Sequence, residues 1–525
     1  MLFCGCFYKV NRGGVENLVI RNSLHIKSTI FILNMNYIKI MSLGIRGKFV
    51  IGFDGTEHRI IRDGIVVVEG NRIKYVGKNF SGSIDRWIEA PTGLVMPGLI
   101  NTHIHASTAP KDKGFIDDVG VRHFYMSSLG ENLTALGQAM RGSDFEIFSK
   151  FSLAECLKSG NTTVVEIGMV STLGADEAVR VIDEIGIRAT EGPIIADGTW
   201  ERSQGADLRT KWLGLEAGIK KLDEADRFAK LYDGACGGRL MPALYGDTVD
   251  KCSEDLQKAI RAKANELKTP VTIHAGQWVV EFNNMIRMYR RTPVEFLMDT
   301  GLLGSDLIIG HGWAIAGHPL VSYPSVDGGD LAILAKSGAT ISHDPLVFAK
   351  RGNKMHSHTA YLKAGVNVSI GTDTVPQDLL NEMRIASYTS KLADWDCHSG
   401  ASRDIFNSAT LGGARGLGRS DLGRLSPGAI ADIAVIEMET FNGVPYRDPI
   451  KNLINSSQRS DVRWVIVDGK VVVEDGKLTT IDELKLLNDV QRAGEGIWSR
   501  IPEHHYLKQS ADEVSPLSFK LWESD

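Results

Sequence analysis

The 525-residue chain has few cysteines, no excess of basic charge and no long apolar run, and each of these absences excludes a class of protein. Its six cysteines are too few for a disulfide-stapled secreted scaffold, and none of them has zinc-finger spacing. The net charge is −5 and no basic run with interleaved aromatics occurs, so we expect no nucleic-acid partner. Scattered cysteines at this density are typical of reduced thiols, and we predict a cytoplasmic protein.

No stretch of the chain is apolar for long enough to span a bilayer. The best candidate, Ser28–Met41, contains Lys39 and two asparagines, and it has no convincing small-residue cleavage site. We therefore expect no membrane partner and no secretory signal. Residues 1–40 are an oddly composed leader, and we treat them as an extension of uncertain order.

Short β-rich pieces occur near both ends of the chain. Residues 47–88 contain apolar pieces separated by turn residues, and the same texture returns in Gly428–Val435 and Val462–Gly476. Two β-rich pieces at opposite ends of one chain most simply form one unit. We predict a small composite β-sandwich domain built from residues 41–93 and 425–480.

The middle of the chain, residues 94–424, alternates apolar runs with helical patterns such as that of Ser253–Lys268. Eight apolar runs with helices between most of them predict a (β/α)8 barrel of the TIM type, which belongs to the α/β class. Residues 481–525 should form a C-terminal helical segment and tail. The eight runs are Leu94–His103, Thr162–Ile167, Ile187–Pro193, Leu240–Tyr245, Pro270–His274, Leu307–His311, Ala339–His343 and Val366–Asp373.

Polar residues stand at the C-terminal ends of these runs, where a barrel of this type carries its chemistry. His103 and His105 end the first run two residues apart, so both imidazoles face the same side of a strand. His274, His311 and Asp373 end later runs. Imidazoles with a carboxylate suit Zn²⁺, Fe²⁺, Co²⁺ or Mn²⁺, and such an ion would lower the pKa of a coordinated water toward neutrality. Each residue alone is more often structural, but the whole set at consecutive barrel positions favours a metal site.

Three segments carry a resemblance to the amidohydrolase superfamily, in its branch of guanine, adenosine and cytosine deaminases and triazine hydrolases. PGLINTHIHAS (97–107) matches the first-strand signature, IGTDTVPQDLLNEMR (370–384) the eighth-strand segment, and NSATLGGARGLGRSDLGRLSPGAIADIAVIE (407–437) the return into the β-domain. The resemblance covers nearly everything from Ile45 to Glu483.

The resemblance implies that His103, His105, His274 and Asp373 bind a metal ion and that Asp373 also activates the hydrolytic water. It implies that His311 hydrogen-bonds the water or the substrate and stabilises developing charge. Binuclear members use a carboxylated lysine on a middle strand, and the fourth run of this chain contains none, so we predict one divalent ion. Zinc is favoured, with iron, cobalt or manganese as alternatives. The branch also suggests a homo-oligomer with a small-molecule substrate.

One departure from the family pattern affects the predicted reaction. The deaminases of this branch have a glutamate three positions after the fifth-strand histidine, whereas this chain has Gln277. A carboxamide cannot exchange a proton at neutral pH, so we assign Gln277 to the catalytic set only as a hydrogen-bond partner. Glu281, one helical turn further, could substitute, although the simpler expectation is that it faces solvent. The segment after His343-Asp-Pro also departs from the family pattern, from Leu346 to Lys350.

The loops after the strands should supply the substrate contacts. Their aromatic residues suggest a partly aromatic pocket for a planar molecule, although packing under a loop is an open alternative for each of them. We assign His343, Phe115 and Trp278 to substrate binding. Further candidates are Phe124, Trp200 and Phe348.

The sequence therefore predicts a mononuclear metal-dependent hydrolase acting at a trigonal carbon of a small planar or heterocyclic substrate. The bond cleaved would be C–N, with C–Cl or C–S as further possibilities. One alternative is an aminohydrolase of a purine, pyrimidine or triazine. A second is a non-catalytic scaffold on the same fold, against which the complete ligand set argues.

Overall fold

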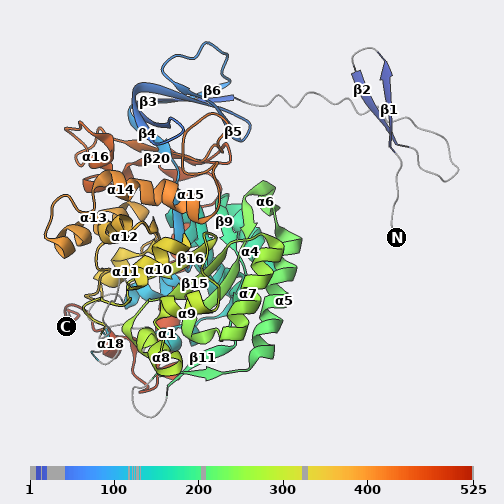
Figure 1. Cartoon of the computed structure of the whole chain (residues 1–525). Coiled ribbons are helices and arrows are strands. Elements are labelled where there is room, and N and C mark those ends of the chain that lie inside the picture. The colour runs from blue at the N-terminus through green and yellow to red at the C-terminus, as the bar shows by residue number, and fades with distance from the viewer. Residues whose placement is uncertain are drawn as a thin grey trace.

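The computed structural model describes residues 7–12, 15–20, 42–115, 132–202, 208–321 and 329–522, and in addition residues 119, 120, 122, 125 and 129. Figure 1 shows a β-rich part at one end and a larger part of strands and helices beside it. No helix among the described residues is both long and apolar enough to cross a membrane.

Ten short parallel strands form the barrel, in the order β10-β14-β15-β16-β17-β18-β7-β8-β9-β13. β9 and β10 together occupy the third strand position of the barrel, and β13 and β14 together occupy the fourth. β9 pairs with β13 and β10 pairs with β14, so both pairs belong to the contact between these two positions. The sheet therefore closes on itself with eight strand positions, and the expected (β/α)8 barrel is confirmed. The strands are β7 (Leu99–Ile104), β8 (Asn161–Glu166), β9 (Arg188–Glu191), β10 (Ile194–Ile195), β13 (Leu240–Pro242), β14 (Leu244–Thr248), β15 (Val271–Ala275), β16 (Leu307–His311), β17 (Thr340–His343) and β18 (Asn367–Ile370).

Helices surround the barrel strands, and α4, α5 and α7 lie along one flank in Figure 1. α7 (Glu254–Leu267) illustrates how the sequence sets their limits: Ser253 accepts a hydrogen bond from the Leu256 amide at its start, and Lys268 ends it with a φ of 55°. The others are α1 (Leu133–Gln138), α2 (Gly142–Lys158), α3 (Met169–Leu173), α4 (Ala175–Ile185), α5 (Leu215–Tyr232), α6 (Ala235–Gly238), α8 (Val279–Tyr289), α9 (Pro293–Asp299), α10 (Gly329–Ser337), α11 (Pro345–Ala349), α12 (His358–Ala364), α13 (Leu379–Asp394), α14 (Ser402–Asn407), α15 (Gly413–Gly416), α16 (Pro449–Asn455), α17 (Glu483–His504) and α18 (Ala511–Val514).

Both ends of the chain contribute to an eight-stranded sheet, in the order β22-β21-β20-β19-β6-β3-β4-β5 (Figure 1). β6 joins the two halves, because it pairs parallel with β3 and antiparallel with β19. The composite β-domain is thus confirmed, and its strands form one continuous sheet. The strands are β3 (Ser42–Phe53), β4 (His58–Glu69), β5 (Arg72–Gly77), β6 (Arg86–Pro97), β19 (Ile433–Glu437), β20 (Val462–Val467), β21 (Lys470–Glu474) and β22 (Lys477–Leu478).

The passage from this sheet into the barrel occurs at Gly98. The apolar run expected as one strand from Leu94 is divided there, since β6 ends at Pro97 and β7 begins at Leu99. A Cβ at position 98 would lie 2.2 Å from the Thr162 side chain, so only glycine permits this close approach. The Gly98 amide donates to the Asp432 carbonyl at 2.9 Å, which ties the crossing point to the C-terminal half of the sheet.

A buried ion-pair cluster fixes the barrel against the β-sheet. Arg188 on β9 contacts Asp432 at 2.9 Å and Asp468 at 3.1 Å, and the Arg188 and Asp432 side chains are nearly inaccessible. Asp468 belongs to the turn between β20 and β21, so one barrel residue holds two segments of the C-terminal half. Two further antiparallel pairs are β1 (Phe7–Arg12) with β2 (Val15–Ile20) and β11 (Gly198–Arg202) with β12 (Leu208–Trp212).

Candidate active site

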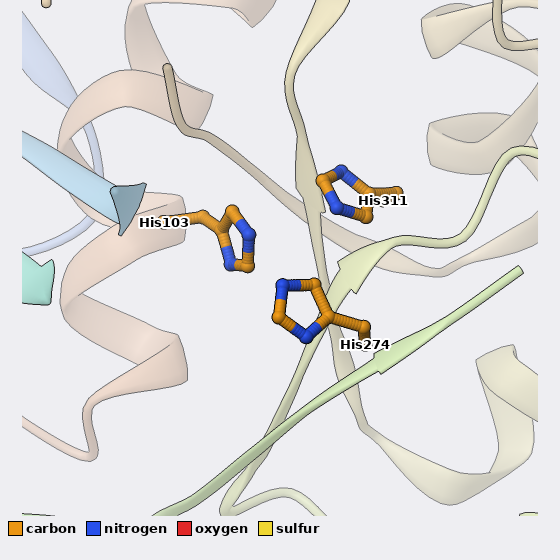
Figure 2. A group of neighbouring side chains, drawn as sticks. All are labelled: His103, His274 and His311. Atoms are coloured by element: carbon orange, nitrogen blue, oxygen red, sulfur yellow. The ribbon is translucent and has the colours of Figure 1, made fainter. Parts of the chain in front are cut away.

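Histidines from three barrel strands meet at the C-terminal end of the barrel. His103 lies on β7, His274 on β15 and His311 at the end of β16. Figure 2 shows their three rings turned toward one another. One ring nitrogen from each lies within 4.8 Å of the others. The strand-end positions that the sequence singled out therefore do converge, as parallel strands of a barrel require.

Asp373 and His105 complete this cluster from the first and last strand positions. Asp373 Oδ1 lies 3.7 Å from His103 Nε2 and 3.4 Å from His105 Nε2. The Asp373 amide donates to the His103 carbonyl at 2.9 Å, and the His105 amide donates to the Asp373 carbonyl at 3.0 Å. These backbone bonds hold the segment after β18 against the end of β7.

The ring tautomers of His105 and His274 can be assigned from their partners. His105 Nδ1 lies 3.0 Å from the Ile167 carbonyl oxygen, and His274 Nδ1 lies 2.6 Å from that of Asp247. A carbonyl oxygen only accepts, so each Nδ1 carries the hydrogen and each Nε2 presents a lone pair. The two Nε2 atoms lie 3.2 Å apart, a close approach of two lone pairs that a shared cation would stabilise. Burial lowers the pKa of His274 well below its usual value, which disfavours a proton as that cation.

His103 gives a second reason to place a cation here. Its side chain is inaccessible, and neither ring nitrogen has a hydrogen-bond partner in the part of the chain that the structure describes. A buried nitrogen without a partner is costly, and a coordinated metal would satisfy one of the two. The imidazoles and the carboxylate fit a divalent metal ion.

The backbone is held in an unusual conformation at two residues of this cluster. His311 has a φ of 82° and Asp373 a φ of 57°, in the left-handed region that non-glycine residues rarely adopt. Each such residue costs on the order of 1 kcal/mol or more, and such conformations gather at functional sites.

His311 is oriented by a buried carboxyl group. Its Nδ1 lies 2.8 Å from Asp344 Oδ2. The two atoms are close enough to attract one another, although their geometry does not meet the criteria of a hydrogen bond. Burial lowers the pKa of His311 to about 4, so its imidazole is neutral at physiological pH. A neutral imidazole can donate a hydrogen bond without bringing a second positive charge to a metal site.

A cavity of about 300 Å³ lies over the cluster and is lined by His105, His274, His311, Asp373 and Gln277. Its size is at the lower end of the range for small-molecule sites. Aromatic and charged residues complete much of its wall: Trp200, Tyr245, Phe348, Lys111, Asp112, Asp247, Lys251 and Arg351.

The three residues assigned to the substrate do not line this cavity. Phe115 packs in an apolar cluster with Phe148 and residues of α17. The side chain of His343 turns toward α12, where its Nδ1 lies 3.0 Å from that of His358. Trp278 is buried beside Trp200, with ring centroids 5.5 Å apart. Their roles stay predictions, and Phe124 lies outside the described residues.

Gln277 lies in a turn that Glu281 holds in place. Glu281 accepts hydrogen bonds from the amides of Gly276 at 2.7 Å and Gln277 at 3.2 Å. The expectation that Glu281 faces solvent is wrong, because it is fully buried and turns back to satisfy amides beside the start of α8. Glu281 does not line the cavity, so its observed role is to support the turn. Burial raises the pKa of its carboxyl group well above the usual value.

Arg351 lines the cavity and was missed from the sequence. It follows α11 in an irregular segment, where no periodicity indicates the direction of a side chain. The available signal was its place eight residues after His343, directly beyond the stretch that departs from the family pattern.

Several known proteins similar to this chain carry the name of a deaminase. The 5'-deoxyadenosine deaminase of Methanosarcina barkeri is 29% identical over 462 residues, which cover 87% of this chain and 98% of the relative. The 5-methylthioadenosine/S-adenosylhomocysteine deaminase of Pyrococcus abyssi is 30% identical over 452 residues, with coverages of 85% and 97%.

Solved structures share the fold. An adenosine deaminase from Xanthomonas campestris with bound zinc aligns with a TM-score of 0.75 at 22% identity, covering 87% of this chain and 98% of its own. The atrazine chlorohydrolase of Arthrobacter aurescens TC1, complexed with zinc, aligns with a TM-score of 0.70 at 22% identity, with coverages of 86% and 100%. The sequence profile of the amidohydrolase family matches residues 94–472, from the end of β6 to β21. The chain therefore belongs to the amidohydrolase family.

Proposed function

We propose that this protein is a mononuclear metal-dependent hydrolase that uses water to cleave a C–N bond at a trigonal carbon of a small planar substrate. The convergence of His103, His105, His274 and Asp373 carries the proposal, above all the two imidazole lone pairs 3.2 Å apart. Membership of a hydrolase family supports the same reaction type.

We propose that these four residues bind a single divalent ion, with zinc favoured. The zinc in the two structural neighbours supports this choice, while iron, cobalt and manganese suit the same ligands. Such an ion supplies Lewis acidity and lowers the pKa of a coordinated water. β13 and β14 contain no lysine that could be carboxylated to bridge a second ion.

The chain's own residues then have separate tasks. Asp373 accepts the proton of the attacking water, since its carboxylate lies beside the ligand imidazoles. His311 donates a hydrogen bond to the group on which charge develops. Gln277 hydrogen-bonds the substrate from the cavity wall and delivers no proton.

A second candidate is an aminohydrolase that releases ammonia from an aminoheterocycle. The deaminase names of the relatives at 29% and 30% identity favour it. Because Gln277 cannot protonate a ring nitrogen, this reaction would need the proton that Asp373 takes from the attacking water.

Metal analysis of the purified protein, followed by a product screen, tests the proposal. About one tightly bound ion per chain supports the enzyme, and no bound ion supports a scaffold. Release of ammonia, amines, chloride and thiols should then be measured over heterocycles, ureas and carbamates. Release of ammonia alone would favour the aminohydrolase. Homo-oligomeric assembly and a cytoplasmic location remain further proposals, which chromatography and cell fractionation would test.

A further inference from the structure

Three basic residues line the active-site cavity, and two of them are already paired. Lys111 Nζ lies 3.0 Å from Asp112 Oδ1, and Lys251 Nζ lies 2.8 Å from Asp247 Oδ2. Lys251 also lies over the Trp200 ring, 4.0 Å from its centroid. The two lysines and the two aspartates therefore contribute no net charge to the wall.

Arg351 is the third basic residue of the cavity wall, and it has no charged partner among the described residues. Its guanidinium forms no ion pair with them and donates them no side-chain hydrogen bond, although it lines the same cavity as His274, His311 and Asp373. Burial lowers the pKa of Arg351 from its usual value, and the charges of Asp373 and Asp112 oppose that effect. An arginine keeps its proton in proteins, so a positive charge with unused donors faces the cavity.

The two nearby carboxylates do not account for this charge. Asp112 is paired with Lys111, and Asp373 lies within the histidine cluster. A partly buried cation without a partner is costly, which argues that a ligand supplies the missing anion.

The backbone around Arg351 is fixed before any ligand binds. The Arg351 amide donates to the Phe348 carbonyl at 2.9 Å, and the Asn353 amide donates to the same oxygen at 2.9 Å. Phe348 itself lines the cavity, so one short segment contributes both an aromatic side chain and a guanidinium to the wall. Such preorganisation reduces the entropy lost on binding.

We propose that the substrate is a planar ring that bears a carboxylate, and that Arg351 binds this carboxylate. The two oxygens of a carboxylate match the fork of a guanidinium, which makes the contact directional as well as charged. The inference rests on the proposed function in that the cavity is taken to be the substrate site.

Calorimetric titration of the zinc-loaded protein with nicotinate and with nicotinamide tests the proposal. The two probes share one ring and differ in a carboxylate against a neutral carboxamide, so any contact of the ring nitrogen with the metal is common to both. Wild-type protein should bind nicotinate roughly 10- to 100-fold more tightly than nicotinamide. In Arg351→Met this ratio should fall to about 1, because the charge and the fork are both lost. Arg351→Lys should keep part of it, because only the fork is lost.

Arg180→Met is the matched control, since it removes an arginine whose ion pairs with Glu146 and Glu184 lie outside this cavity. It should leave the nicotinate preference within about 3-fold of wild type. The proposal is overturned if wild-type protein shows no preference, or if the preference survives in Arg351→Met because the metal binds the carboxylate. Should Arg351→Met fail to fold, an undiminished preference in Arg351→Lys would overturn it equally.

The readout is binding and not turnover, so the two proposals fail separately. A protein that prefers nicotinate through Arg351 but has no metal-dependent hydrolysis would refute the proposed function alone. A metal-dependent hydrolase without this preference would refute only the role of Arg351.

Discussion

The role of His274 as a metal ligand can be tested by removing its imidazole. His274 Nδ1 is committed to the Asp247 carbonyl, so only Nε2 remains for a metal. We expect His274→Ala to lose bound metal and turnover, because no neighbouring side chain replaces Nε2. Metal analysis and the hydrolytic rate measure both effects. His318→Asn is the control, because His318 is equally buried but bonds the Lys354 carbonyl at 3.0 Å, away from the cluster. Retention of both metal and rate in His274→Ala would contradict the assignment.

The size of the rate loss on substitution of Gln277 distinguishes a hydrogen-bond partner from a general acid. If it only hydrogen-bonds the substrate, Gln277→Ala should lower the rate about 2- to 12-fold, the worth of one neutral hydrogen bond. Loss of a general acid would instead cost on the order of 10²- to 10⁴-fold. Steady-state kinetics on any substrate found in the screen separates these ranges. Gln277→Glu restores an exchangeable proton and should raise deamination of an aminoheterocycle if the second candidate reaction is the native one.

The side chains of the site differ in how far the sequence could predict them. Five of them could be predicted because each lies at or just after the end of an apolar run, and the C-terminal ends of barrel strands gather at one rim: His103, His105, His274, His311 and Asp373. Loop residues have no such rule. His343 turns away from the cavity because it contacts His358, fifteen positions later. Arg351 lies in a turn that is formed by hydrogen bonds to the Phe348 carbonyl, and no sequence periodicity predicts this turn.

At the scale of elements, Asp330 couples α9 to α10. Its carboxylate accepts from Thr292 Oγ1 at 2.7 Å, at the N-terminus of α9, and from the Ala316 amide at 2.8 Å. Burial raises the pKa of Asp330 to about 6. A raised carboxyl pKa means that the folded state binds the proton more tightly, so this contribution to stability is present at low pH and is lost as the pH rises through 6.

We therefore expect the stability of wild type relative to Asp330→Asn to fall between pH 4.5 and 7.5. The expected change is on the order of 2 kcal/mol in the difference between their free energies of unfolding. Urea unfolding of both proteins at several pH values measures it, and the other titrating groups cancel in the difference. A difference that does not vary with pH would show that Asp330 is ionised in the folded protein throughout this range.

The limits of a helix or strand could be predicted closely where its apolar residues follow a single clear spacing. α7 begins and ends within a residue of the expected Ser253–Lys268, because the cap residues and the apolar stripe agree. The run from Leu94 was predicted as one strand and is two, because Pro97 and the close approach at Gly98 separate segments that pair with different sheets. Pairing partners are not encoded in local periodicity. The exact limits of the domains remain a prediction.

At the scale of the whole molecule, Arg188 links the barrel to the β-sheet. Arg188→Ala leaves Asp432 buried without its cation, and removal of one member of a buried pair typically costs about 3–5 kcal/mol. We expect a loss of that size in the free energy of unfolding by urea. The control is Arg180→Ala on α4, which removes exposed ion pairs with Glu146 and Glu184 and should cost about 1 kcal/mol or less. Equal losses in the two variants would show that the cluster at Arg188 does not hold the two parts together.

The composite sheet has a consequence for how the chain is made. β6 leaves the ribosome early, but its partner β19 follows only after every barrel strand has been synthesised. At about 5–20 residues per second this delay lasts on the order of tens of seconds, during which one edge of β6 has no native neighbour. An open, apolar strand edge is a template for pairing with another chain. The nascent protein is therefore most exposed to misassembly on crowded polysomes, and a chaperone that shields this edge until translation ends would raise its yield.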